Sequence, residues 1–100
     1  MLWAIYSIDK PNSAALRNEH MKAHSAYLKT HDDVIFFSGP LQSDDGTANI
    51  GSLWIINANS RDAAKAFSDG EAFTRAGVFA SIMISRTRLG HLHPELAGTK

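Results

Sequence analysis

Hydrophobic residues recur along the chain in short runs that are separated by polar turns. Four of these runs are rich in aromatic and branched side chains and predict β-strands, over residues 2–8, 33–40, 50–58 and 78–88. Two other segments repeat apolar residues at helical spacing and predict helices, over residues 14–31 and 61–69. The predicted order of elements is therefore β-α-β-β-α-β.

The ends of the helices follow from residues with strong local preferences. Asn12 or Ser13 is expected to cap the first helix, and Ser60 the second. Gly70 is expected to end the second helix, and residues 71–77 to form one further helical turn.

This order of elements is typical of the ferredoxin-like α+β fold, in which helices cover one face of an antiparallel sheet. Gly39–Pro40 should end the second strand, and Asp45–Gly46 predicts a turn before the third. We expect one domain over residues 1–88. Residues 89–100 are expected to form a C-terminal tail, or an arm laid on a neighbouring molecule.

The predicted strands are apolar on both faces, whereas a sheet with one solvated face alternates apolar and polar residues. In the first strand, Tyr6 and Ile8 point away from Trp3 and Ile5, and residues 34–37 are apolar throughout. The chain has helices enough for only one face. We therefore expect a homodimer in which two sheets pack face to face, as in dimeric α/β barrels.

Composition excludes several classes of function. Ten basic and ten acidic residues cancel, so no overall field favours nucleic acid or an anionic membrane as a partner. The chain has no cysteine, which excludes disulfides, thiolate catalysis and cysteine-based metal sites. Neither a signal-peptide pattern nor a membrane-spanning run is found, and we expect a cytoplasmic protein.

Candidate chemistry is concentrated in residues 17–31, which contain three of the five histidines. On a helix of 3.6 residues per turn, His20, His24 and His31 fall on or beside the apolar face, together with Arg17. These four side chains should point toward the sheet or its rim.

Three interpretations of the histidines are possible. They are partly buried rings with ordinary hydrogen-bond partners, or His20 and His24 share a metal with His31 as a third ligand. In the third interpretation, one histidine transfers protons and is oriented by a carboxylate. Asp69 and Glu71, on either side of Gly70, are the candidate carboxylates, although each is also explained by its place at a helix end.

Several segments in this order resemble the YciI-like (YCII-related) family: LWAIYSIDKP, LRNEHMKAHSAYL, FFSGPLQSDDGTANIGSLWII and EAFTRAGVF. The resemblance covers nearly the whole predicted domain and leaves only the tail. It implies a ferredoxin-like α+β domain that dimerises through its sheets, in agreement with the two-sided apolar strands.

The resemblance also implies a histidine–carboxylate pair. His24 corresponds to the histidine of the family's A-H-L motif, and Glu71 stands where the family has the aspartate of a D-P-aromatic motif. The chain departs from this motif twice, with glutamate for aspartate and Ala72 for proline, so Asp69 is an alternative partner. Met21 replaces an arginine that often precedes the histidine.

If the pair operates, His24 is a general base held by Glu71 or Asp69. No serine or cysteine nucleophile accompanies it, which favours proton abstraction, elimination or isomerisation, or hydrolysis without a covalent intermediate, and no cofactor is expected. The family includes a dehydrochlorinase that acts on a chlorinated aromatic diol, so dehydrochlorination of a small molecule is one expectation.

Further residues are expected around this pair. Arg17 would hold an anionic substrate or otherwise form a surface salt bridge, and Ser38, Gly39 and Pro40 would wall the pocket, as would the loop at residues 44–46. Four aromatic residues would line an apolar pocket or, more simply, pack in the core: Trp3, Tyr6, Phe37 and Trp54.

Two alternatives to an enzyme remain open from the sequence. The first is a non-catalytic dimeric protein that binds a small molecule or serves as an accessory in a pathway. The second is a metal or haem site at His24 or His20.

Overall fold

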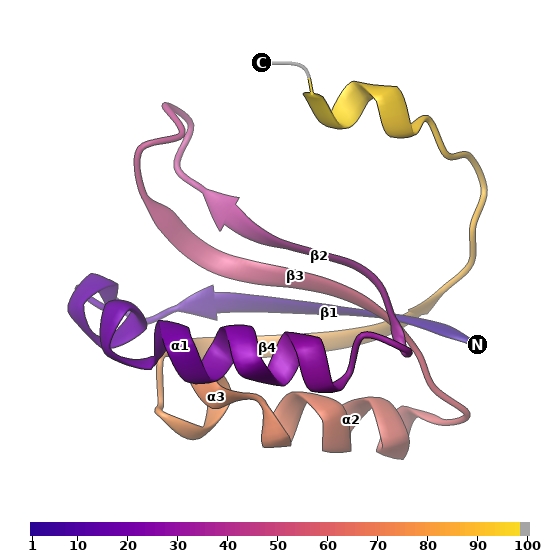
Figure 1. Cartoon of the computed structure of the whole chain (residues 1–100), viewed down its shortest axis with the longest axis horizontal. Helices are drawn as coiled ribbons and strands as arrows, with labels where there is room; N and C mark the ends of the chain where they lie inside the picture. Colours follow the sequence, from indigo (N-terminus) through magenta and orange to yellow (C-terminus); the bar gives the residue numbers. More distant parts are fainter. Residues whose placement is uncertain (99–100) are drawn as a thin grey trace.

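The computed structural model describes residues 1–98 and contains a four-stranded antiparallel sheet with helices on one face (Figure 1). The elements follow one another as β1 (Leu2–Asp9), α1 (Ala14–Thr30), β2 (Ile35–Gln42), β3 (Asn49–Asn57), α2 (Arg61–Gly70), α3 (Ala72–Arg75), β4 (Phe79–Thr87) and the 3₁₀ helix η1 (Pro94–Gly98). The strand order is β2-β3-β1-β4. The predicted ferredoxin-like α+β fold is confirmed.

The core lies between the sheet and its helices, because alternate residues of the two central strands face that side. Trp3 and Ile5 of β1 and Trp54 of β3 are buried there, together with Ala64 and Phe67 of α2. None of the helices in residues 1–98 is long and apolar enough to cross a membrane.

The second strand differs from its prediction at both ends. It begins at Ile35 instead of residue 33, because a turn precedes it in which the Val34 amide donates to His31 O at 3.0 Å. It also continues through Gly39–Pro40 to Gln42. Proline is accommodated because β2 is an edge strand, where a missing amide donor need not break a ladder bond.

The helix ends agree with prediction only in part. Ser60 caps α2, its Oγ accepting from the Ala63 amide at 3.1 Å. Ser13 stands at the start of α1, but its hydroxyl donates to Lys10 O at 2.6 Å instead of capping the helix. Asn12, the other predicted cap, has a positive φ of 61° and precedes that position.

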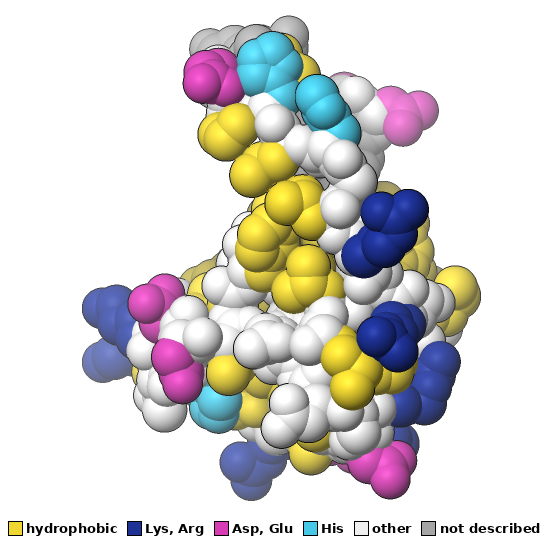
Figure 2. Space-filling model, turned by 90° about the vertical axis from the view of Figure 1, so that its right-hand side faces the viewer, with side chains coloured by type: hydrophobic (Ala, Val, Ile, Leu, Met, Phe, Trp, Pro, Cys, Tyr) yellow, Lys and Arg dark blue, Asp and Glu magenta, His cyan; other side chains and the backbone are white. Residues whose placement is uncertain are grey.

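After β4 the chain leaves the sheet and extends as an arm that ends in η1 (Figure 1). Leu89, Leu92 and Leu96 of this arm are each more than half exposed. Figure 2 shows hydrophobic side chains continuing from the body of the molecule onto the arm. That the arm lies on a neighbouring molecule stays a prediction, as does the division of the chain after residue 88.

Gly51 of β3 has no room for a side chain. A Cβ atom there would lie 2.4 Å from Ser7 O of β1 and 2.8 Å from Leu41 Cδ1 of β2. The β1 backbone and the Leu41 side chain of β2 can therefore approach this point only because residue 51 is glycine.

Replacing Gly51 with alanine should lower the free energy of unfolding by about 1–3 kcal/mol, because the added methyl overlaps a backbone oxygen that cannot move aside. Chemical denaturation followed by circular dichroism measures this. Gly39→Ala is the matched control, since its Cβ would meet only the Phe37 ring edge at 3.4 Å. Equal stability of the two variants would contradict the prediction.

Candidate active site

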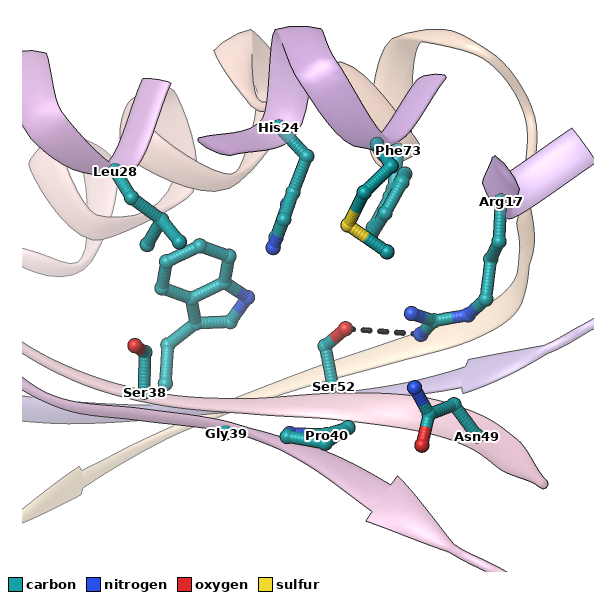
Figure 3. A pocket seen from close by; sticks show the side chains of 11 residues that line it. Arg17, His24, Leu28, Ser38, Gly39, Pro40, Asn49, Ser52 and Phe73 are labelled. Atoms are coloured by element: carbon teal, nitrogen blue, oxygen red, sulfur yellow. Dashed lines mark hydrogen bonds between the residues drawn. The ribbon is translucent and has the colours of Figure 1, made fainter. Parts of the chain in front are cut away.

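His24 reaches from α1 toward the sheet between two aromatic rings (Figure 3). Its imidazole stacks on Phe73, with 4.1 Å between centroids and 10° between planes, and meets the edge of Trp54 at 5.5 Å. Only 15% of its side chain is exposed. These contacts hold the ring in one orientation and leave Nε2 on the side away from its hydrogen-bond partner.

That partner is Glu71, whose Oε1 is hydrogen-bonded to His24 Nδ1. The chain turns at Glu71, between α2 and α3, and its Oε2 accepts the amides of Phe73 at 3.0 Å and Thr74 at 3.4 Å. Glu71 is 1% exposed. Because the carboxylate accepts, Nδ1 carries the hydrogen in the neutral ring, and Nε2 presents a lone pair.

The structure does not bring Asp69 to this site. Its carboxylate lies on the surface, where Oδ2 accepts from Lys65 Nζ at 2.7 Å across one turn of α2. Of the two candidate carboxylates, Glu71 is the one in contact with His24.

The other two histidines, His20 in α1 and His31 just after it, have partners other than Glu71. His31 Nδ1 is hydrogen-bonded to Tyr27 O at 2.9 Å, and its ring stacks on that of Tyr27. His20 is partly exposed, with Nε2 3.9 Å from Glu19. No cluster of three or more histidine, aspartate or glutamate side chains that could hold a metal ion is found in residues 1–98, so the three histidines do not converge.

Arg17 is buried, so the prediction of a surface salt bridge for it is wrong. Its Nε donates to Asp9 Oδ2 at 2.5 Å and its Nη2 to Asp9 Oδ1 at 3.0 Å, with both side chains at most 7% exposed. Nη2 also donates to Gly51 O at 2.7 Å and Ser52 Oγ at 3.0 Å. The guanidinium lies 4.7 Å from the centroid of the Phe73 ring.

The nitrogen Nη1 of Arg17 has no acceptor among the described residues. In residues 1–98 the one fully buried side-chain polar atom without a partner is Ser7 Oγ, so Nη1 reaches an accessible surface. Arg17 therefore has the two N–H groups of Nη1 left for another molecule.

A cavity of about 240 Å³ opens in front of His24 and Arg17, between α1 and the sheet (Figure 3). Both polar and apolar side chains line it: Arg17, Met21, His24, Leu28, Ser38, Gly39, Pro40, Asn49, Ser52, Trp54 and Phe73. The three predicted wall residues from β2 are among them. Glu71 and Asp9 are not, because they stand behind His24 and Arg17.

Some predicted pocket residues lie elsewhere. Of the four aromatic residues, Trp54 alone lines the cavity, and Trp3 is core. Tyr6 and Phe37 are 43% and 46% exposed on the other face of the sheet, so assigning them to the pocket or the core is wrong for this chain. The loop at residues 44–46 does not line the cavity; Asp45 closes its turn by accepting from Ser43 and Thr47.

Sequence reasoning missed Asp9 behind Arg17 and five residues that line the cavity: Met21, Leu28, Asn49, Ser52 and Phe73. A signal was present for Asp9 and Ser52. An arginine on the apolar face of a helix requires a buried acceptor, and Asp9 ends the strand that precedes the helix. Ser52 interrupts the apolar run of β3 on the side that faces the helices.

The pKa of the Tyr27 hydroxyl depends on the charge of Glu71, although Tyr27 does not line the cavity. Burial raises the pKa of the Tyr27 hydroxyl, and the negative charge of Glu71 raises it further. This hydroxyl donates to Phe67 O at 2.8 Å.

Comparison with known proteins gives a family match over most of the chain. The YCII-related domain matches residues 1–88. Protein YciI of Escherichia coli O6:H1 (strain CFT073) is 33% identical over 91 residues, which cover 84% of this chain and 93% of that protein. Protein YciI of Shigella flexneri matches to the same extent.

Two solved structures are similar. The 5-chloro-2-hydroxyhydroquinone dehydrochlorinase TftG of Burkholderia phenoliruptrix AC1100, in complex with 2,5-dihydroxybenzoquinone, is 34% identical with a TM-score of 0.82 over 90% of this chain and 96% of that one. PA3566 from Pseudomonas aeruginosa is 17% identical with a TM-score of 0.52 over 89% and 94%, which supports the fold alone.

Replacing Glu71 with glutamine should lower the pKa of Tyr27, because removal of a nearby negative charge makes the phenolate easier to form. The phenolate absorbance can be titrated in a Tyr6→Phe background, in which Tyr27 is the remaining tyrosine of the two. Asp69→Asn is the matched control and should leave this titration unchanged. A similar shift in both variants, or none in Glu71→Gln, would contradict a buried charge at Glu71.

Proposed function

Since the chain belongs to the YCII-related family, we propose that it is a small-molecule enzyme in which His24 acts as the general base and Glu71 orients it. The observation that carries this proposal is the position of His24, with a buried carboxylate on Nδ1 and a cavity in front of Nε2. A carboxylate behind an imidazole selects the tautomer and stabilises the imidazolium that forms when a proton is taken up.

In the proposed reaction, Nε2 takes a proton from a carbon or hydroxyl of the substrate. In an elimination, the electron pair of that bond moves into the substrate and a leaving group departs with its own bonding pair. The proton on His24 then returns to water. Isomerisation uses the same first step and returns the proton to another atom, and in a hydrolysis His24 would deprotonate a water molecule.

The substrate would be held by groups on the other walls of the cavity. Arg17 offers Nη1 to a substrate oxygen, and Ser38 offers a hydroxyl from β2. Gly39 and Pro40 of the same strand form a flat wall against which a ring can lie. Trp54 and Phe73 make the inner walls apolar, which suits an aromatic or alicyclic body.

Elimination of chloride is the first reaction to test. TftG, a structural neighbour at 34% identity, is a dehydrochlorinase of a chlorinated hydroxyhydroquinone. The match covers nearly all of that protein, and the cavity of this chain has room for one ring. Identity at this level supports the reaction class more strongly than the individual substrate.

His24→Asn should reduce kcat/KM for chloride release by at least about 100-fold, since asparagine fills the space but cannot transfer a proton. Chloride release from 5-chloro-2-hydroxyhydroquinone and related chlorinated phenols is measured in the absence of oxygen. Glu71→Gln should also reduce the rate, and ¹⁵N shifts of the His24 ring should show loss of the Nδ1–H tautomer.

Asp69→Asn is the control for this experiment and should retain the parent rate, because Asp69 pairs with Lys65 on the surface. A parent protein that binds such compounds without converting them would instead identify a non-catalytic binding protein. Unchanged turnover in His24→Asn would reject His24 as the base.

We also propose that the protein is a homodimer joined through the open face of the sheet. The residues of β1 that face away from the helices, and the partners of β1 on that face of β3 and β4, are uncharged. They include Leu2, Ala4, Tyr6, Ile8, Leu53, Ile55, Met83 and Ser85. Phe37 of β2 joins this face beside Ile55. An uncharged, largely apolar sheet face of this extent favours association with a second copy.

Tyr6→Glu should convert the dimer to a monomer, because Tyr6 lies on a central strand beside Leu53 and Met83, and the new charge would be desolvated in the interface. Sedimentation velocity measures the change. Asn18→Glu, on the exposed side of α1, should leave the dimer intact. A parent protein that sediments as a monomer would reject the proposal.

A further inference from the structure

The Phe73 ring is the flat surface against which the imidazole of His24 lies (Figure 3). The two rings are parallel to within 10°, with 4.1 Å between their centroids, and Phe73 is fully buried. Any aliphatic side chain could supply an apolar wall. A parallel stack at this distance is a more specific contact, and it is made with the side chain that carries the proton in the proposed reaction.

A single hydrogen bond does not fix the plane of an imidazole. Glu71 Oε1 holds Nδ1, but the ring could still turn about the line that joins these two atoms. Because Nε2 lies off that line, such a turn would redirect its lone pair. Phe73 blocks the turn by lying flat on the imidazole, and Trp54 meets the imidazole at 65°. The tautomer is therefore set by Glu71, whereas the plane of the ring is set by aromatic contacts.

Phe73 is itself held in place by the charged groups around it. Glu71 Oε2 accepts the Phe73 amide at 3.0 Å, so the two oxygens of one carboxylate hold the histidine and the ring on which it stacks. The Arg17 guanidinium, fixed by Asp9, lies 4.7 Å from the centroid of the Phe73 ring. The Phe79 ring packs across that of Phe73 at 6.4 Å and 85°. The Phe73 ring therefore has little freedom to move.

The stack is also an electrostatic contact. The face of an aromatic ring carries partial negative charge and attracts a cation within about 6 Å of its centroid. In the proposed reaction His24 becomes an imidazolium when it takes a proton, so its contact with Phe73 is stronger after proton transfer than before it. An interaction that strengthens during the reaction raises kcat, whereas one of constant strength changes only binding.

We propose that Phe73 is a positioning residue for His24. Its ring fixes the plane of the imidazole, which aims Nε2 at the cavity, and the face of the ring stabilises the imidazolium. The proposal rests on the proposed function, since Phe73 acts through the base assigned there. It gives this ring a part in the chemistry in addition to its place in the cavity wall.

Phe73→Leu should lower kcat for chloride release by about 3- to 30-fold and change KM by less than about threefold, because leucine has no flat aromatic face. Phe79→Leu is the matched control. Phe79 contacts the Phe73 ring but is not among the residues that line the cavity, so this variant should keep the parent kcat. A higher KM with unchanged kcat would overturn the proposal, as would equal losses of kcat in both variants.

A fluorinated ring separates the effect of charge from that of shape. 3,4,5-Trifluorophenylalanine at position 73 keeps an aromatic ring but removes most of the negative charge from its face. This variant should lower kcat and leave the plane of the imidazole unchanged. Because it retains the ring, it also serves if Phe73→Leu does not fold. The parent kcat in this variant would overturn stabilisation of the imidazolium by Phe73.

The plane of the His24 ring is measured without turnover, in crystal structures of the parent and of Phe73→Leu. The imidazole should lie parallel to Phe73 in the parent and turn about the line from Nδ1 to Glu71 Oε1 in the variant. An unchanged plane would overturn the positioning role. A turned ring in the variant, with no chloride release by the parent, would reject the proposed function and retain the role of Phe73 in orienting the imidazole.

Discussion

The buried ion pair between Arg17 and Asp9 is the interaction on which the arrangement of the site depends. Arg17 belongs to α1, Asp9 ends β1, and the same guanidinium bonds to Gly51 and Ser52 of β3. A buried arginine without these acceptors would be strongly unfavourable, by about 3–5 kcal/mol for loss of one partner. The helix is therefore held at one position over the sheet. His24 follows two turns later on the same side of α1 and is carried into the cavity.

Glu71 has a comparable role behind His24. It separates α2 from α3, and one oxygen caps the short helix while the other holds His24. The capped helix places Phe73 against the imidazole and beneath the Arg17 guanidinium. One aromatic ring thus connects the two charged pairs, so that changes at either pair are expected to affect the other.

The two faces of the sheet serve different purposes. The cavity opens on the face covered by helices, where Ser52 and Trp54 point. The proposed dimer uses the other face, where Tyr6 and Met83 are exposed. Association through that face would bury apolar surface without filling the cavity, which allows the chemistry and the assembly to be tested independently.

Strand and helix order, and with them the ferredoxin-like fold, were determined by hydrophobic periodicity in the sequence, because that periodicity depends on neighbouring residues alone. The same holds for the position of His24 on the inner side of its helix. Local signals failed at Pro40, because its tolerance depends on β2 being an edge strand.

The choice of Glu71 over Asp69, and the pairing of Arg17 with Asp9, were decided only by the tertiary structure. Glu71 lies 47 positions from His24, and spacing carries no information across such a distance. Asp69 and Glu71 are two positions apart, yet the turn after Gly70 directs one carboxylate to the surface and the other into the core. A buried charge requires a partner, and the chain path determines which partner is within reach.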